Sequence, residues 1–174
     1  FRATTCNPHL FISVLRVYLS IMSARLQITL FQPEIAGNVG AVMRSCACLG
    51  AGLTLIAPCG FPLGAKGMRR AAMDYQVPGD VQVAQDWDAF IAAPRAGRLV
   101  LLTTKGATPL QDFAFAPGDT LIFGAEGSGV PDHVHTAADA RVVIPMAAGA
   151  RSLNLSNSVA VTLFEALRQT QNLP

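Results

Sequence analysis

The chain has 174 residues, of which 51% are hydrophobic, enough for one domain that buries roughly two thirds of its unfolded-chain surface. Thirteen Lys and Arg against eleven Asp and Glu leave a net charge of +2, so net charge gives no indication of nucleic-acid binding and any polyanion site must be a local cluster. The four cysteines form no C-x-x-C pair, which favours reduced, buried thiols in a cytoplasmic protein over a disulfide or metal framework.

Residues 1–21 are expected to form an N-terminal extension ahead of one domain over residues 22–174. The extension contains an apolar run that resembles the core of a signal peptide, but Arg16 interrupts it and it is too short to span a membrane. Met22 lies just before the first strand pattern, so an upstream extension and an over-called start both stay open. No membrane association is predicted.

From Leu26 onward, short apolar runs alternate with helical patterns. Strands are expected at 26–31, 53–58, 81–84, 98–104, 119–124 and 141–146. Helices are expected at about 38–49, at 86–93, shortly after Pro131 and at about 155–170, while a Gly- and Arg-rich stretch reaching about residue 75 has no assigned element. This alternation predicts an α/β domain whose largely parallel sheet is covered on both faces.

Four polar segments follow strands of the predicted sheet. In parallel sheets, ligands bind beyond the carboxyl ends of the strands. We therefore expect these segments to carry the chemistry: QPEIAGNVGAVMR, TTKGATPL, GAEGSGVP and PMAAGARSLNLS.

The first segment leads into a helix that contains Asn38, Gly40 and Arg44. Asn38 can cap the helix, and Gly40 permits close approach of another backbone. Because the helix is otherwise small and apolar almost all round, we expect it to be buried and Arg44 to need a carboxylate, a phosphate or a substrate as its partner. The alternative is an N-capped helix with a solvated Arg44.

The segment GAEGSGVP contains a single charge, Glu126, which is placed to pair with Arg44. A flexible turn is the alternative. The glycine spacing G-x-x-G-x-G does not match the dinucleotide-binding fingerprint, and no P-loop motif occurs in the chain. NAD binding and P-loop chemistry therefore lack their signatures.

The densest positive cluster consists of Lys66, Arg69 and Arg70. With the nearby Tyr75, it can hold a nucleic-acid backbone through phosphate contacts and stack on a base. A solvated helix surface is equally compatible with the pattern.

An H-x-H pair, His133 and His135, is the one local hint of a metal. No acidic or thiol partner lies at ligand spacing. We therefore place both histidines on the surface of a short helix and predict no metal.

The end of the last segment and the two residues after it concentrate polar side chains in eight positions, 151–158: Arg151, Ser152, Asn154, Ser156, Asn157 and Ser158. One cap residue, Asn154 or Ser156, is enough for the helix that follows, so the surplus indicates a further role. The helix carries an apolar stripe for core or dimer packing at Leu155, Val159, Leu163 and Leu167.

Taken in this order, the segments resemble the SPOUT class of RNA methyltransferases, and within it the small tRNA (cytidine/uridine-34)-2'-O-methyltransferases of the TrmL type. The matching stretches lie within residues 26–170 and read LFQPEIAGNVGAVMRSCACLG, RRAAMDYQ, LLTTKG, LIFGAEGSGVP and VVIPMAAGARSLNLSNSVAVTLFEALR.

The resemblance implies an α/β-knot (SPOUT) fold with a deep trefoil knot near the C-terminal end, and a homodimer with the active site near the subunit interface. It implies that S-adenosylmethionine donates a methyl group to the ribose 2'-hydroxyl of tRNA nucleotide 34, cytidine or modified uridine, and leaves as S-adenosylhomocysteine. Leucine isoacceptors are the expected substrates.

The resemblance also gives roles to individual residues. Contacts to the cofactor are expected from Leu102, Gly124, Ile144 and Ser152. The catalytic residue is Arg44, supported by Glu126, Ser152 and Asn154, while Lys66, Arg69 and Arg70 contact the tRNA. We expect Arg44 to orient the hydroxyl and stabilise developing alkoxide charge, because a guanidinium stays protonated at neutral pH and is a poor base.

The chain departs from the resemblance in three places. The first loop lacks a second Pro and a Thr that relatives often have, and the glutamate loop has Gly127 and Ser128 where larger polar residues are common. Phe164 replaces a Tyr found in several relatives and is expected in the core. Two rival functions stay open. The first is methylation of another tRNA position or of rRNA. The second is a non-catalytic RNA-binding relative, which predicts damaged motifs, whereas Asn38, Arg44, Glu126, Ser152 and Asn154 are all present.

Overall fold

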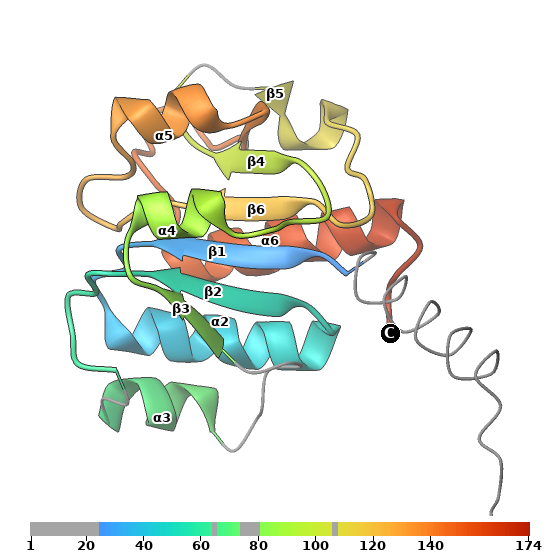
Figure 1. The fold of residues 1–174 in the computed structure, drawn as a ribbon. Helices are drawn as coiled ribbons and strands as arrows, with labels where there is room; N and C mark the ends of the chain where they lie inside the picture. The colour runs from blue at the N-terminus through green and yellow to red at the C-terminus, as the bar shows by residue number, and fades with distance from the viewer. Residues whose placement is uncertain (1–24, 64–65, 74–80, 106–107) are drawn as a thin grey trace, which may run out of the picture.

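The computed structural model describes residues 25–63, 66–73, 81–105 and 108–174, in which seven parallel strands form one sheet with helices on both faces (Figure 1). The strands are β1 (Gln27–Phe31), β2 (Gly52–Ile56), β3 (Val81–Ala84), β4 (Leu99–Leu102), β5 (Thr108–Pro109), β6 (Thr120–Phe123) and β7 (Ala140–Val143). The helices are α2 (Ala36–Leu49), α3 (Lys66–Ala72), α4 (Trp87–Ala92), α5 (Asp132–Ala137), α6 (Leu155–Gln169) and the short 3-10 helix η1 (Leu110–Asp112). The strand order is β3-β2-β1-β6-β4-β7-β5.

The predicted α/β class and parallel sheet are confirmed, with three local corrections. The Gly- and Arg-rich stretch forms a helix, α3, and the segment TTKGATPL contains the short strand β5. Strands β2, β4 and β7 end two to three residues earlier than expected, at Ile56, Leu102 and Val143. The predicted extension 1–21 and Tyr75 lie outside the described residues, and the trefoil knot stays a prediction of the resemblance.

One face of the sheet is covered by α2 and α6, which lie behind the strands in Figure 1. Helix α2 buries Val39, Val42 and Cys46 against this face. The predicted stripe of α6, which consists of Leu155, Val159, Leu163 and Leu167, is at most 7% exposed and packs into the same cluster. The stripe therefore belongs to the core.

The opposite face is covered by the two short helices α4 and α5. Phe31, Ile56 and Ile122 lie on this face and pack with Trp87 of α4 and Val134 of α5. Phe31 and Ile56 end β1 and β2, so on these two strands the short helices cover the carboxyl ends.

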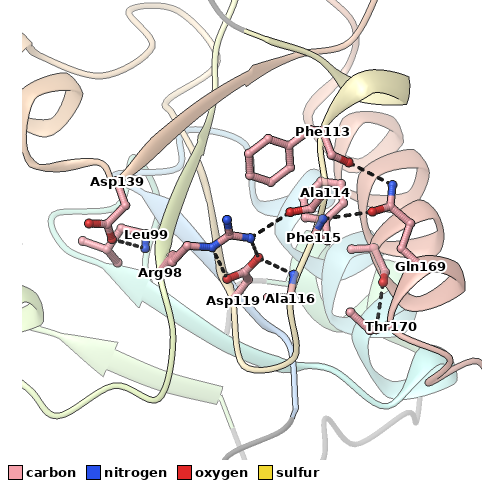
Figure 2. Close-up of polar contacts among 11 residues, drawn as sticks. Arg98, Leu99, Phe113, Ala114, Phe115, Ala116, Asp119, Asp139, Gln169 and Thr170 are labelled. Atoms are coloured by element: carbon pink, nitrogen blue, oxygen red, sulfur yellow. Dashed lines mark hydrogen bonds and ion pairs between the residues drawn. The ribbon is translucent and has the colours of Figure 1, made fainter.

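The connection from η1 to β6 is fastened at both of its ends (Figure 2). Arg98, just before β4, donates through Nε and Nη2 to Asp119 at 3.0 and 2.7 Å. Gln169, at the end of α6, donates to the Phe113 carbonyl at 3.0 Å and accepts from the Phe115 N–H at 2.9 Å. The chain between β4 and β6 is thereby tied to the last turn of α6.

The thiols only partly match the expectation of buried cysteines. Cys46 is buried, and burial raises its pKa to about 12, while Cys59 is half-buried with a pKa that burial also raises. Cys48 is exposed because it lies two residues after Cys46 on α2, on a different side of the helix. No helix in the described ranges is long and apolar enough to cross a membrane.

Candidate active site

A pocket of about 540 Å³ lies at the carboxyl edge of the sheet, where the four predicted segments meet. It brings together Leu102, Gly124, Glu126, Ile144, Ser152 and Asn154, which include every residue predicted to contact a cofactor. The early ends of β4 and β7 leave Thr103 and Ile144 as irregular backbone in the pocket wall. The rule that ligands bind beyond the carboxyl ends of parallel strands therefore located the pocket correctly.

Asn38 connects two of the predicted polar residues by hydrogen bonds. Its Nδ2 donates to Oε1 of Glu126 at 2.9 Å, and its Oδ1 accepts from Nδ2 of Asn154 at 3.0 Å. An ionised carboxylate only accepts hydrogen bonds, so Glu126 requires the amide group of Asn38 to face it. This leaves the carbonyl oxygen of Asn38 for Asn154 and fixes the orientation of both amides.

Because Nδ2 of Asn154 faces Asn38, its Oδ1 is left to cap α6. Its Oδ1 accepts from the backbone N–H groups of Ser156 at 2.9 Å and Asn157 at 3.3 Å, and from Oγ of Ser156 at 2.7 Å. Asn154 therefore both caps the helix and faces the pocket. Asn38 does not cap α2, because that helix begins at Ala36 and Asn38 lies within its first turn.

The glutamate loop is a closed turn held to the segment before α2. Ala125 and Gly129 exchange two backbone hydrogen bonds of 2.9 Å, and a Cβ at Gly124 would collide with the backbone of Gly129. The loop and Glu34 form a reciprocal clasp: the Glu34 N–H donates to Oε2 of Glu126 at 2.8 Å, and the Gly127 N–H donates to Oε2 of Glu34 at 2.7 Å. These contacts favour a defined loop over the flexible turn.

Arg44 is exposed on α2 and does not line the pocket, so the expectation of a wholly buried helix is wrong. Arg44 follows Gly40 by four residues, so it lies on the side of α2 that faces α3, near the end of that helix. Nη1 of Arg44 donates to Sδ of Met73 at 2.9 Å. The expected pair with Glu126 is not found, since Asn38 and the Glu34 N–H bind the two carboxylate oxygens.

The basic residues Lys66, Arg69 and Arg70 are exposed on α3, outside the pocket. Gly40 permits the packing of α3 on α2 as predicted, since a Cβ there would collide with the Met68 carbonyl oxygen. At the start of α3, a Cβ on Gly67 would lie 3.7 Å from that of Ala36, the first residue of α2. The basic helix therefore begins beside the end of α2 that reaches the pocket.

Three cationic or titratable residues without an individually predicted role line the pocket: Lys105 and Arg151, which lie in the predicted segments, and His135, which does not. The surface position expected for His135 is wrong: it is half-buried, and its Nδ1 is buried with no hydrogen-bond partner among the described residues. His133, two residues earlier on α5, is exposed and lies edge-on to Trp87 at 6.1 Å between ring centroids. In the part of the chain that the structure describes, no three His, Cys, Asp or Glu side chains gather as a metal site.

The outer side of α6 carries exposed apolar side chains. Val161 is 46% exposed and Phe164 is 51% exposed, so the core position expected for Phe164 is wrong. Phe164 follows the buried Leu163 directly, and successive helical residues point about 100° apart. Phe164 therefore cannot share the buried stripe.

Sequence comparison places this site among known proteins. A model of the SpoU rRNA Methylase family matches residues 25–164. A tRNA (cytidine(34)-2'-O)-methyltransferase of Ancylobacter novellus is 48% identical over 147 residues, a match that covers 83% of this chain and 93% of the relative. One of Burkholderia ambifaria with the same name is 49% identical over 146 residues, covering 82% and 94%.

Structural comparison agrees. A solved structure concerned with "2-OH methylation of C/U34 on tRNA" superimposes with a TM-score of 0.79 at 38% identity and covers 84% of this chain and 97% of its own. The SpoU methyltransferase AviRb of Streptomyces viridochromogenes, in complex with AdoMet, gives a TM-score of 0.71 at 29% identity and covers 84% and 58%.

Proposed function

The chain belongs to the SpoU rRNA Methylase family, and from this premise we propose that it transfers a methyl group from S-adenosylmethionine to the 2'-hydroxyl of tRNA nucleotide 34. The observation that carries the proposal is the pocket in which Glu126, Ser152 and Asn154 lie beside all the residues expected to contact the cofactor. Two relatives that share nearly half of the sequence are named for this reaction on cytidine 34.

The lining of the pocket fits S-adenosylmethionine. Leu102 and Ile144 offer apolar surface, and the glycine turn from Gly124 to Gly129 leaves backbone groups accessible to a purine edge. When bound, the cofactor supplies a methyl group on a positively charged sulfur. Glu126 is held to Asn38 at the pocket wall, so the position of its carboxylate and the orientation of Asn154 are set before a ligand enters.

We place Arg44 in the active site of a second copy of the chain. Arg44 lies outside the pocket of its own chain, exposed on α2, and Val161 and Phe164 form an exposed apolar stripe on α6, which packs beside α2. A homodimer formed through this stripe buries it and carries each Arg44 toward the partner's pocket. There the guanidinium orients the ribose hydroxyl and stabilises the developing alkoxide.

The RNA is held by positive charge around the pocket. Lys105 and Arg151 line the pocket itself, and the exposed cluster of α3 begins beside the start of α2. This cluster, Lys66, Arg69 and Arg70, offers three phosphate contacts. Substitution of these residues by Gln should weaken tRNA binding and flatten its salt dependence. A tRNA substrate is consistent with a cytoplasmic location, and leucine isoacceptors stay the expected targets.

The reaction is tested with tritiated S-adenosylmethionine and total tRNA from a strain that lacks the wobble modification, followed by nucleoside mapping. The expected product is a 2'-O-methylated nucleoside at position 34. Methylation of rRNA or at another tRNA position overturns the wobble assignment but keeps the enzyme class. Absence of any methylation supports the non-catalytic alternative.

The shared site is tested by mixing two inactive variants, Arg44→Ala and Ser152→Ala. After subunit exchange, half of the dimers are mixed, and each mixed dimer has one intact site if Arg44 acts in the partner's pocket. About a quarter of wild-type activity should therefore return. No recovery, with exchange confirmed by mass spectrometry, places Arg44 in its own chain's site, and loss of dimerisation on Phe164→Glu checks the proposed interface.

A further inference from the structure

A second hollow, of about 500 Å³, lies on the face of the sheet opposite α2 and α6. Its floor is polar and consists of Gln27, Thr29, Thr54, Gln82 and Thr120. Thr29 is paired in register with Thr54, and Thr54 with Gln82, so the polar side chains form a continuous row across three strands. Strands of a parallel sheet covered on both faces are normally apolar on both sides, so this row needs an explanation.

The hollow exists because α4 is only six residues long. The chain continues from α4 through Ala93, Pro94 and Arg95, which form a wall of the hollow with Phe90. The apolar residues near the carboxyl ends of β1 and β2 are covered, whereas the polar row next to them faces the hollow.

Thr29 places an unsatisfied polar group at the floor of the hollow. Its side chain is fully buried, and its Oγ1 has no hydrogen-bond partner among the described residues. A buried hydroxyl without a partner destabilises the protein unless a ligand or water satisfies it. Thr29 lines the hollow with its Oγ1 covered, so a ligand on the floor reaches that hydroxyl by displacing the neighbouring side chains.

The charges around the hollow select an anion. Arg25 is half-buried and Arg95 is exposed, and both line the hollow, where the described lining residues include no Asp or Glu. Nη1 of Arg95 donates to the Ile91 carbonyl at 3.0 Å, which directs the side chain back along α4 and leaves other guanidinium donors for a ligand. Glutamine amides can bind the polar edge of a base, and the Phe90 ring offers apolar contact.

We propose that this hollow binds a ribonucleoside monophosphate, either free or as one nucleotide of an RNA chain. The phosphate lies between Arg25 and Arg95, and the nucleoside lies over the threonine and glutamine floor. The site is separate from the methyl-transfer pocket, since the two share no lining residue. It therefore does not depend on the reaction proposed above.

The proposal is tested by NMR of the full chain with labelled threonine methyl groups, in saturating S-adenosylhomocysteine so that nucleotides do not enter the first pocket. Adenosine 5'-monophosphate should shift the signals of Thr29, Thr54 and Thr120 saturably while Thr103, in the first pocket, stays constant. Adenosine and inorganic phosphate should each bind about tenfold more weakly, because each lacks half of the contacts.

Two threonines provide a matched pair of variants. Thr29 and Thr162 are both fully buried with an unpartnered Oγ1, but Thr162 lies on α6 and does not line the hollow. Thr29→Val should weaken nucleotide binding about threefold, Thr162→Val should not change it, and Arg25→Gln with Arg95→Gln should weaken it about tenfold. Shifts of Thr54 and Thr120 report binding in each variant.

Competition with a single-stranded RNA hexamer distinguishes a free nucleotide from one that belongs to an RNA chain. Displacement of the mononucleotide by the hexamer assigns the hollow to RNA, and failure to displace it assigns the hollow to a free nucleotide. The proposal is overturned if no saturable shift occurs, if inorganic phosphate binds as tightly as the nucleotide, or if the two threonine variants behave alike. Methylation activity measured in parallel keeps these outcomes separate from the proposed function.

Discussion

Glu126→Gln should destabilise the protein although it preserves the size of the side chain. Glu126 accepts one hydrogen bond on each oxygen, from Asn38 Nδ2 and from the Glu34 N–H. A glutamine has a single acceptor oxygen, so its amide group must face one of these two donors. If it faced Asn38, the Asn38 amide would have to turn over, and Asn154 would then turn away from the N–H groups it caps.

The loss of stability in Glu126→Gln depends on which of the two hydrogen bonds the glutamine cannot make. The Glu34 N–H is exposed and can be hydrated, whereas the contact with Asn38 is partly buried and orients Asn154. The glutamine oxygen should therefore stay on Asn38, and one exposed charge-assisted hydrogen bond is lost, at a cost of about 1.5 kcal/mol. Turning the two asparagines would add the loss of a helix cap, about 1 kcal/mol more.

Glu34→Gln is the matched control. In the clasp, Glu34 accepts one hydrogen bond, from the Gly127 N–H, and a glutamine oxygen can accept it equally well. Its cost should be below about 0.5 kcal/mol, since only the charge assistance is lost. Urea unfolding of both variants measures the difference in the free energy of unfolding. Equal destabilisation by the two substitutions would refute the argument that Glu126→Gln acts by removing one of two occupied acceptor oxygens.

Three further predictions concern the rest of the chain. Arg98→Ala should cost about 3 kcal/mol, more than Asp119→Asn, because the Asp119 carboxylate is 1% exposed and is left without its partner, whereas Arg98 is 42% exposed and can be hydrated; urea unfolding ranks the two. Hydrogen bonds from the Arg168 guanidinium lower the pKa of Glu165 to about 2. The stability that these bonds provide is therefore present above about pH 4.5 and is lost as the pH falls toward 2. Glu165→Gln should flatten that part of an acid unfolding profile. Iodoacetamide should alkylate Cys48 but not Cys46, whose pKa burial raises to about 12, as peptide mass spectrometry can show.

The sequence predicts the layers of the fold because buried strands and amphipathic helices have distinct apolar patterns. It does not predict α3, a seven-residue helix without an apolar stripe, whose packing depends on the absence of a side chain at Gly40. It does not predict β5 either, since that strand has two residues, one of them Pro109. Both elements depend on tertiary contacts that no local pattern records.

The sequence predicts which loops form the pocket, but the predicted pair between Glu126 and Arg44 is wrong. The carboxyl-end rule places Glu126, Ser152 and Asn154 in one pocket, but charge alone suggested a bond from Glu126 to Arg44. A nearby asparagine and a backbone N–H occupy the carboxylate instead, and sequence gives no measure of which donor is closer. The sequence did not place His135 in the pocket, because one side of the six-residue helix α5 faces the pocket while the adjacent side faces solvent.

Part of the concentration of polar residues around the start of α6 follows from the two tasks of Asn154. One of its side-chain atoms must cap the helix and the other must reach Asn38, so neither task can be left to a neighbour without losing the other. Ser156 supports the cap by donating to the same oxygen, and Ser152, outside the helix, faces the pocket. The helix start is thus oriented from Glu126 through Asn38, which links the packing of α6 to the loop that lines the pocket. The exposed stripe of the proposed dimer, Val161 and Phe164, lies on this same helix.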